Sequence, residues 1–211
     1  MRHVLLTGLV GLCFVSSAEA VLIIDAGPSS TSSYFVTGAT DSFTIGSEFE
    51  TTSSVTLNAL GFLDMEGDGL AGNHQVGLWN VSDESLIASV TVTPTSSTVL
   101  SSQGTALWFM ESISAVNIGP GTYRIGGEIT GNIDKGYLGN DNIENGVTIN
   151  GGFVQNTYRS GGFGYPHLQY FPRLVYATAN AAVPEPSTLA IWGILGGLGM
   201  IAARRRRKRL A

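Results

Sequence analysis

The sequence Ser-Val-Thr-Leu-Asn-Ala-Leu-Gly-Phe at residues 54–62 decides the fold class, because apolar and polar residues alternate along it. Val55, Leu57 and Ala59 fall on one side of an extended chain, which is the two-residue period of a β-strand. No segment between residues 21 and 177 sustains the i, i+3, i+4 apolar spacing of an amphipathic helix. We therefore expect the body of the protein to be built of strands.

Other short apolar runs on both sides of this stretch are candidate strands. They are Val21–Asp25, Ser42–Ile45, Gln75–Asn80, Leu86–Thr93, Ala106–Ile113, Gly121–Thr130, Tyr170–Ala177 and, less regular, Phe153–Tyr158. Glycine, asparagine and aspartate separate the runs, and Asp83-Glu84 is typical of a hairpin tip. Eight or so short strands with polar turns predict an all-β fold, an antiparallel β-sandwich of jelly-roll-like type.

Residues 1–20 have the pattern of a secretory signal peptide. A basic start at Arg2 is followed by an apolar core from Val4 to Val15. The segment ends in Ala18-Glu19-Ala20, the small-residue pattern of a cleavage site, so we expect a helical signal peptide that is removed after Ala20. The apolar core is too short for a transmembrane anchor.

The composition of the body limits its chemistry. The one cysteine, Cys13, lies in the signal peptide, so no disulfide or thiol chemistry is expected in the mature chain. Residues 21–183 contain fourteen acidic and four basic residues, a formal charge of −10. A body of this charge is not expected to bind nucleic acid or an anionic membrane surface. The basic residues are Arg124, Lys135, Arg159 and Arg173.

The last thirty residues contain three consecutive signals. Pro184-Glu185-Pro186 cannot continue a helix or a central strand. The uncharged apolar run 188–203 predicts a transmembrane helix of about 16 residues, shorter than the roughly 20 that span a bilayer comfortably. A basic cluster that stays on the cytoplasmic side follows, formed by Arg204, Arg205, Arg206, Arg207, Lys208 and Arg209.

This three-part ending resembles the PEP-CTERM sorting signal of Gram-negative envelope proteins. The resemblance implies recognition by an exosortase-type membrane protease, which removes the tail and passes the body to the cell surface. The inner membrane would then be a transient partner, held through the tail. A plain C-terminal membrane anchor is the alternative. We divide the chain into the signal peptide (1–20), a β-sandwich domain (21–177), a linker (178–183) and the sorting signal (184–211).

A second resemblance covers about 70 residues of the body. It rests on Leu60-Gly61-Phe62-Leu63-Asp64, Gly67-Asp68-Gly69-Leu70, His74-Gln75-Val76-Gly77-Leu78-Trp79, Leu86-Ile87-Ala88-Ser89 and Gly119-Pro120-Gly121-Thr122-Tyr123-Arg124-Ile125, in this order. This part of the chain resembles a β-sandwich domain common in bacterial surface proteins with the same sorting tail. The resemblance implies a fold but no activity.

The acidic stretch 64–69 is a candidate calcium site. Asp64, Glu66 and Asp68 alternate ahead of a glycine, so their oxygens could converge on one hard cation. The start resembles an Asp-x-Asp-x-Asp-Gly calcium loop, but Gln75 occupies the twelfth position, where such loops carry a bidentate glutamate. A solvated acidic turn is the alternative.

Little in the sequence indicates catalysis. No Gly-x-Ser-x-Gly elbow is present, and His74 and His167 are both more typical of structural or loop residues than of a catalytic base. The three carboxylates of residues 64–69 share one loop, whereas glycosidase acids face each other across a cleft. We therefore expect a protein that is not an enzyme.

Aromatic residues late in the body are candidates for sugar stacking, with core filling as the alternative. They are Tyr158, Phe163, Tyr165, Tyr170 and Phe171, while Trp79 and Trp108 lie on expected strands and are core candidates.

Taken together, the sequence predicts an exported cell-surface or matrix protein, a structural or adhesive component associated with exopolysaccharide or biofilm. The alternatives are a calcium-dependent or carbohydrate-binding module and, third, an enzyme acting on polysaccharide.

Overall fold

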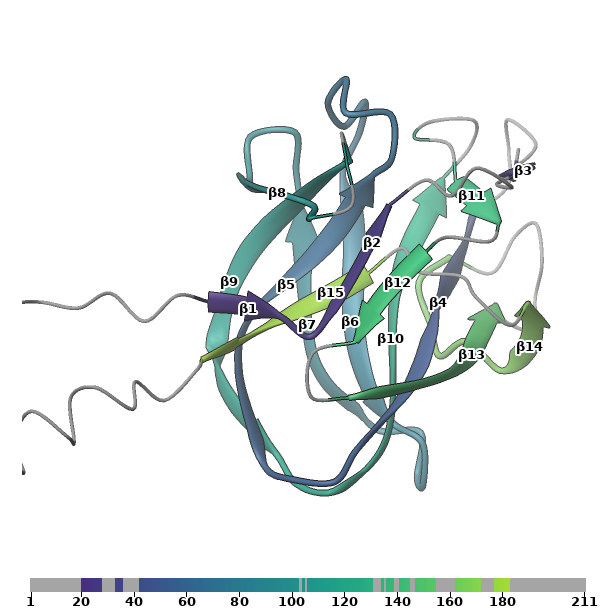
Figure 1. Cartoon of the computed structure of the whole chain (residues 1–211). Helices are drawn as coiled ribbons and strands as arrows, with labels where there is room; N and C mark the ends of the chain where they lie inside the picture. Colours follow the sequence, from purple (N-terminus) through teal and green to yellow (C-terminus); the bar gives the residue numbers. More distant parts are fainter. Residues whose placement is uncertain are drawn as a thin grey trace, which may run out of the picture. The chain divides into compact units, whose positions relative to one another are not determined.

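Two antiparallel sheets face each other in the body of the protein (Figure 1). The computed structural model describes residues 20–27, 33–35, 42–102, 104, 106–130, 134, 136–138, 141–144, 147–154, 162–171 and 177–182. These residues belong to one unit, Ala20–Ala182. The expected signal-peptide helix and transmembrane helix lie outside the described residues, among which no helix could span a membrane.

One sheet has five strands in the order β1-β15-β5-β9-β8, and the other has six in the order β14-β13-β4-β10-β6-β7. Two short pairs, β11 with β3 and β12 with β2, complete the described sheets. The bounds are β1 Ala20–Leu22, β2 Ile24–Gly27, β3 Ser33–Phe35, β4 Ser42–Thr51, β5 Val55–Asp64, β6 His74–Asn80, β7 Leu86–Val92, β8 Ser97–Leu100, β9 Leu107–Ile118, β10 Gly121–Thr130, β11 Gly136–Leu138, β12 Asp141–Glu144, β13 Thr148–Val154, β14 Leu168–Phe171 and β15 Ala177–Ala182.

The core lies between the two large sheets and consists of the inward residue of each alternating pair. Phe62 of β5 packs against Gly127 of β10, where a Cβ atom would come within 2.5 Å of the ring. Phe43, Ile45 and Phe49 on β4 are 0% exposed. Burial of these side chains at about 25 cal/mol per Å² is the main force that joins the sheets.

The all-β prediction is confirmed, and the strands expected at residues 54–62, 75–80, 86–93 and 121–130 are present with bounds that agree to within two residues. The hairpin tip at Asp83-Glu84 is also present, with Glu84 in the left-handed region at a φ of 58°. The jelly-roll-like topology stays a prediction.

The expected linker differs from the structure. Residues 178–182 continue strand β15, which pairs with β5 on one side and β1 on the other. Ala177 and Ala179 are fully buried and face the same side as Phe62 and Leu60, their partners on β5. Alanine has a low strand propensity, so the sequence Thr-Ala-Asn-Ala-Ala gives no local strand signal, and burial of its small side chains decides the structure.

Candidate functional site

The acidic loop after β5 is organised around Asp64. Its Oδ1 accepts backbone N–H bonds from Glu66 (3.1 Å) and Gly67 (2.9 Å), and its Oδ2 accepts one from Gly69 (2.8 Å). Gly67 and Gly69 have φ values of 71° and 101°, so the turn needs glycine at both positions. Asp64 is 4% exposed and caps the loop, and the described residues contain no cluster of three metal-binding side chains. Calcium binding here stays a prediction.

His74 at the start of β6 is a buried cross-link. Its ring is 1% exposed and stacks on Phe62 at 3.8 Å between centroids. Nδ1 lies 2.8 Å from the Glu128 carbonyl oxygen, and Nε2 lies 2.7 Å from Oδ2 of Asp134. The carbonyl is an acceptor, so Nδ1 carries a proton, and the second contact requires a further proton shared between the ring and the carboxyl group. Both ring nitrogens are therefore engaged in structure.

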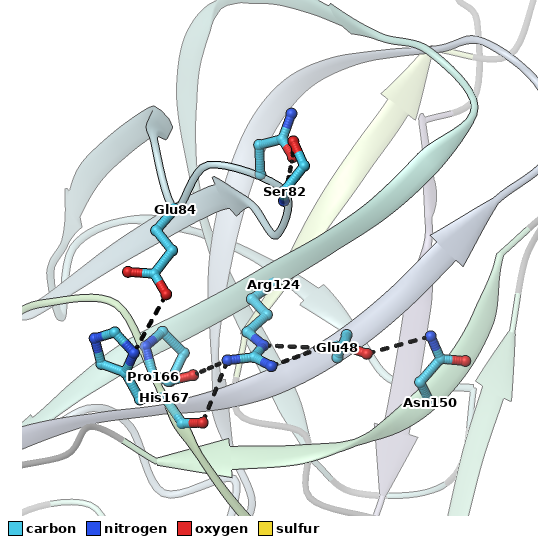
Figure 2. Close-up of polar contacts among 8 residues, drawn as sticks. Glu48, Ser82, Glu84, Arg124, Asn150, Pro166 and His167 are labelled. Carbon is cyan, nitrogen blue, oxygen red and sulfur yellow. Dashed lines mark hydrogen bonds and ion pairs between the residues drawn. The ribbon is translucent and has the colours of Figure 1, made fainter.

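Arg124 on β10 is the centre of a polar cluster on the outer face of the six-stranded sheet (Figure 2). Its Nε and Nη2 atoms donate to Glu48 Oε2 on β4 at 2.9 and 2.8 Å, and Nη1 donates to the Pro166 carbonyl at 2.6 Å. The Arg124 and Glu48 side chains are only 11% and 15% exposed, so the pair is largely removed from water.

Two aromatic rings enclose the guanidinium group. Its central carbon lies 3.7 Å from the centroid of Phe153 and 4.9 Å from that of Tyr165. Burial raises the pKa of the Tyr165 phenol above its ordinary value, although the charge of Arg124 acts in the opposite direction. The arrangement joins β10, β4, β13 and the segment before β14 through one cation.

The segment Gly162–His167, which we call the strap, covers this face. Gly162 donates its N–H to the Ser42 carbonyl and Gly164 donates to Thr44 Oγ1, both on β4. Phe163 packs on Trp79 of β6 at 5.3 Å between centroids, and Tyr165 meets the same ring edge-on at 6.3 Å. Phe163 and Tyr165, two of the candidate sugar-stacking residues, are thus partly buried against the sheet; the side chains of Tyr158, Tyr170 and Phe171 lie outside the described residues.

A row of glycines lets the strap lie close to the sheet. Gly46, Gly126 and Gly77 are direct partners on β4, β10 and β6. A Cβ atom on Gly77 would come within 2.7 Å of the Phe163 ring and 2.5 Å of the Trp79 ring. A larger residue at Gly77 would therefore push the aromatic rings off the face, whereas a Cβ atom on Gly46 would meet the backbone of Ile125 and Gly126.

Asp25 holds the N-terminal strand β2 on the five-stranded sheet. Its Oδ1 accepts from Trp108 Nε1 at 2.8 Å, and its Oδ2 accepts from the Ser102 backbone N–H at 2.8 Å and from the Ser102 hydroxyl. Burial by itself raises the pKa of Asp25, but these hydrogen bonds together outweigh it and bring the pKa below the ordinary value. Trp108, expected as a core residue, is 0% exposed.

Sequence reasoning missed the Arg124–Glu48 pair and the Asp25–Trp108 bond, because their partners are 76 and 83 residues apart. One signal was available for the first. Arg124 is a cation within a predicted strand of a body that has only four basic residues, and a charged residue there requires a partner.

The chain carries a PEP-CTERM protein-sorting motif at residues 182–208. A motif of this class implies an exported, surface-associated protein that is sorted and processed by exosortase. Pro184, Glu185, Pro186 and most of the basic cluster fall within the matched residues. Comparison with curated proteins and with solved structures finds no significant match.

Proposed function

We propose that the protein is a non-catalytic structural or adhesive component of the cell surface or of an exopolysaccharide matrix. The observation that carries this proposal is the position of the sorting motif. It begins at residue 182, where β15 and the body end. Proteolysis near Pro184-Glu185-Pro186 would therefore release the body without removing any residue of a described strand.

The amino end supports the same route. Val21 and Leu22 of β1 pair with Ala181 and Asn180 of β15, so cleavage after Ala20 would leave this pairing in place. Ala20 and Ala182, the described residues next to the two processing points in the sequence, are direct partners on β1 and β15. The body would stay folded through both cleavages, with the inner membrane and an exosortase-type protease as transient partners.

The proposal that the protein is not an enzyme is supported by the positions of its two described histidines. His74 is buried with both nitrogens engaged, and His167 is exposed and contacts Glu84 at 3.5 Å in a turn. Neither is in a position typical of a general base in a cleft.

The sorting step is tested with the full chain in cells that export it. Replacement of the basic cluster 204–209 by glutamine should leave removal of the signal peptide unchanged but impair retention and processing of the tail. An N-terminus at Val21 in both proteins serves as the control for export. Normal processing of the tail in the variant would contradict the proposal that the basic cluster is part of the sorting signal.

The matrix role has its own test. The processed protein should sediment with extracellular polysaccharide and should move to the medium in cells that make none. An unchanged distribution in those cells would contradict the matrix role and leave only the sorting route. The second candidate is a calcium-dependent or carbohydrate-binding module, and an open hollow on the body favours the carbohydrate-binding form of it.

A further inference from the structure

The outer face of the five-stranded sheet has a hollow of about 430 Å³ that lies across β15, β5, β9 and β8. Ala59 and Met110 are among the residues at its base, and polar side chains line it: Asn58, Asn180, Ser97, Ser112 and Glu111. A volume in this range is typical of small-ligand sites, which are about 300–1,000 Å³.

Side-chain size and strand register produce the hollow. Asn180, Ala59 and Ser112 are direct partners on β15, β5 and β9, and Ser97 pairs with Met110 next to them. Because Ala59, Ser97 and Ser112 are small, the face is recessed where neighbouring residues would otherwise fill it. The register also shifts in β5 between Leu57 and Ala59 and in β15 between Asn180 and Ala181. Such irregularities redirect side chains and are frequent next to binding sites.

Asn180 provides an independent indication of a ligand. Its Oδ1 atom is buried and has no hydrogen-bond partner among the described residues. A buried acceptor without a partner destabilises the free protein, and such groups in native structures call for an explanation. The oxygen itself has almost no accessible surface, so a ligand hydroxyl in the hollow would satisfy it once the Asn180 side chain turned to present its amide to the hollow.

The chemistry of the lining matches a polyhydroxylated molecule. Amide and hydroxyl side chains both donate and accept, as sugar hydroxyls do, so Asn58, Asn180 and Ser112 can form complementary pairs with them. Val99, which is 37% exposed, supplies apolar surface for the C–H face of a sugar ring. Of the described residues that line the hollow, none is basic and Glu111 alone is charged.

We propose that this hollow binds a segment of a neutral saccharide chain. The proposal rests on the matrix role proposed above and identifies the site and the class of ligand. Glu111 and the body's formal charge of −10 disfavour an anionic polysaccharide. The site is distinct from the strap, whose aromatic rings are packed on the other sheet.

The test uses affinity electrophoresis of the protein purified from the cells that export it. Native gels contain neutral dextran, galactomannan or hydroxyethylcellulose, or anionic alginate. Two variants change the hollow: Asn180→Leu removes the amide, and Ser112→Phe fills the space from an exposed position. The matched control is Asn117→Leu, since Asn117 is exposed on β9 but does not line the hollow.

We expect at least one neutral polymer to retard the wild type and the control. Each hollow variant should lose about tenfold or more in affinity, the order expected from loss of a buried hydrogen bond or of access. Asn180→Leu should at the same time unfold at an equal or higher temperature, because it removes an unpaired buried acceptor. A fall in both binding and unfolding temperature would indicate mere damage to the fold and would overturn the assignment.

Absence of retardation in every neutral gel, equal retardation by alginate, or equal binding by the hollow variants would also overturn it. A shift of the wild type to dimers that Ser112→Phe abolishes would show instead that a second copy occupies the hollow. If the protein sediments with matrix polysaccharide in cells but the hollow variants do so equally, this site assignment fails while the matrix role stands. If the wild type does not sediment with it, the matrix role itself fails.

Discussion

The outer faces of the two sheets are built differently. On the six-stranded sheet, the strap covers a row of glycines, and Arg124 is held by Glu48 and two aromatic rings. On the five-stranded sheet, β2 covers one part through Asp25 and Trp108, and the hollow lined by Asn58 and Asn180 stays open next to it. On the first face the polar groups pair with each other, and on the second the Asn180 amide oxygen has no partner among the described residues.

The difference distinguishes side chains that stabilise the fold from side chains that are free to contact a ligand. Charged and aromatic residues attract attention as candidate sites, yet here they are engaged in holding the strap. The open face is lined mostly by neutral residues, with Glu111 as a charged exception, and these residues are unremarkable in sequence.

The largest effect on stability is expected from removal of Arg124, the centre of the polar cluster under the strap. Arg124→Ala should reduce the free energy of unfolding by about 3 kcal/mol, because it leaves the largely buried Glu48 carboxylate unpaired. Chemical denaturation measures the change. Glu84→Gln is the control, since Glu84 and His167 are 54% and 41% exposed, and it should cost about 0.5 kcal/mol or less. Equal losses in both variants would contradict the difference between buried and exposed pairs.

Asp25→Asn tests the bonds that hold β2 on the outer face of the five-stranded sheet. At pH 7 it should cost about 2 kcal/mol, because an amide cannot accept from both Trp108 and Ser102 as the carboxylate does. The folded pKa of Asp25 is below its ordinary value, so its contribution is present above about pH 4 and is lost as the pH falls further. The stability difference between wild type and variant should therefore shrink in acid. A difference that is constant from pH 7 to pH 3 would show that the charge of Asp25 contributes nothing.

Gly77→Ala tests whether the close approach of the aromatic rings to the glycine row holds the strap in place. The new methyl group would overlap Trp79 and Phe163, so the strap should shift, with a loss of about 1.5 kcal/mol and faster chymotryptic cleavage after Phe163. Gly119→Ala is a matched control, because its Cβ atom would meet nothing within 4 Å. Similar cleavage rates for wild type and Gly77→Ala would mean that close contact with the sheet does not hold the strap.

The smallest effect is expected for calcium. Asp64 already accepts three backbone N–H bonds, so the loop is formed without the ion. If Asp64, Glu66 and Asp68 bind calcium with millimolar affinity, about 5 mM calcium should stabilise the protein by roughly 1 kcal/mol. Asp68→Asn should remove most of that gain. An unfolding temperature that calcium leaves unchanged would reject the calcium hypothesis.

The regular parts of the fold could be predicted from sequence, and the long-range parts could not. The alternation in residues 54–62 and 121–130 predicts the local strands. It does not predict the inward face along the whole of β5, because the register shift between Leu57 and Ala59 places Ala59 at the outer hollow. Strand β15 has no such signal, because its alanines become a strand only between β1 and β5. The hollow depends on register between Ala59, Ser112 and Asn180, which periodicity within one strand does not encode. The tail differs again, since Pro184-Glu185-Pro186 and the basic cluster are a linear signal that needs no fold to be read.

The intact mass of the protein recovered from each cell fraction tests the central claim most directly. The account predicts a species in the surface or extracellular fraction that begins at Val21 and ends near Pro184-Glu185-Pro186, with all described strands retained except the first residue of β1. A species that keeps Ala211 and stays in the membrane fraction would contradict it, and would describe a permanently anchored protein instead.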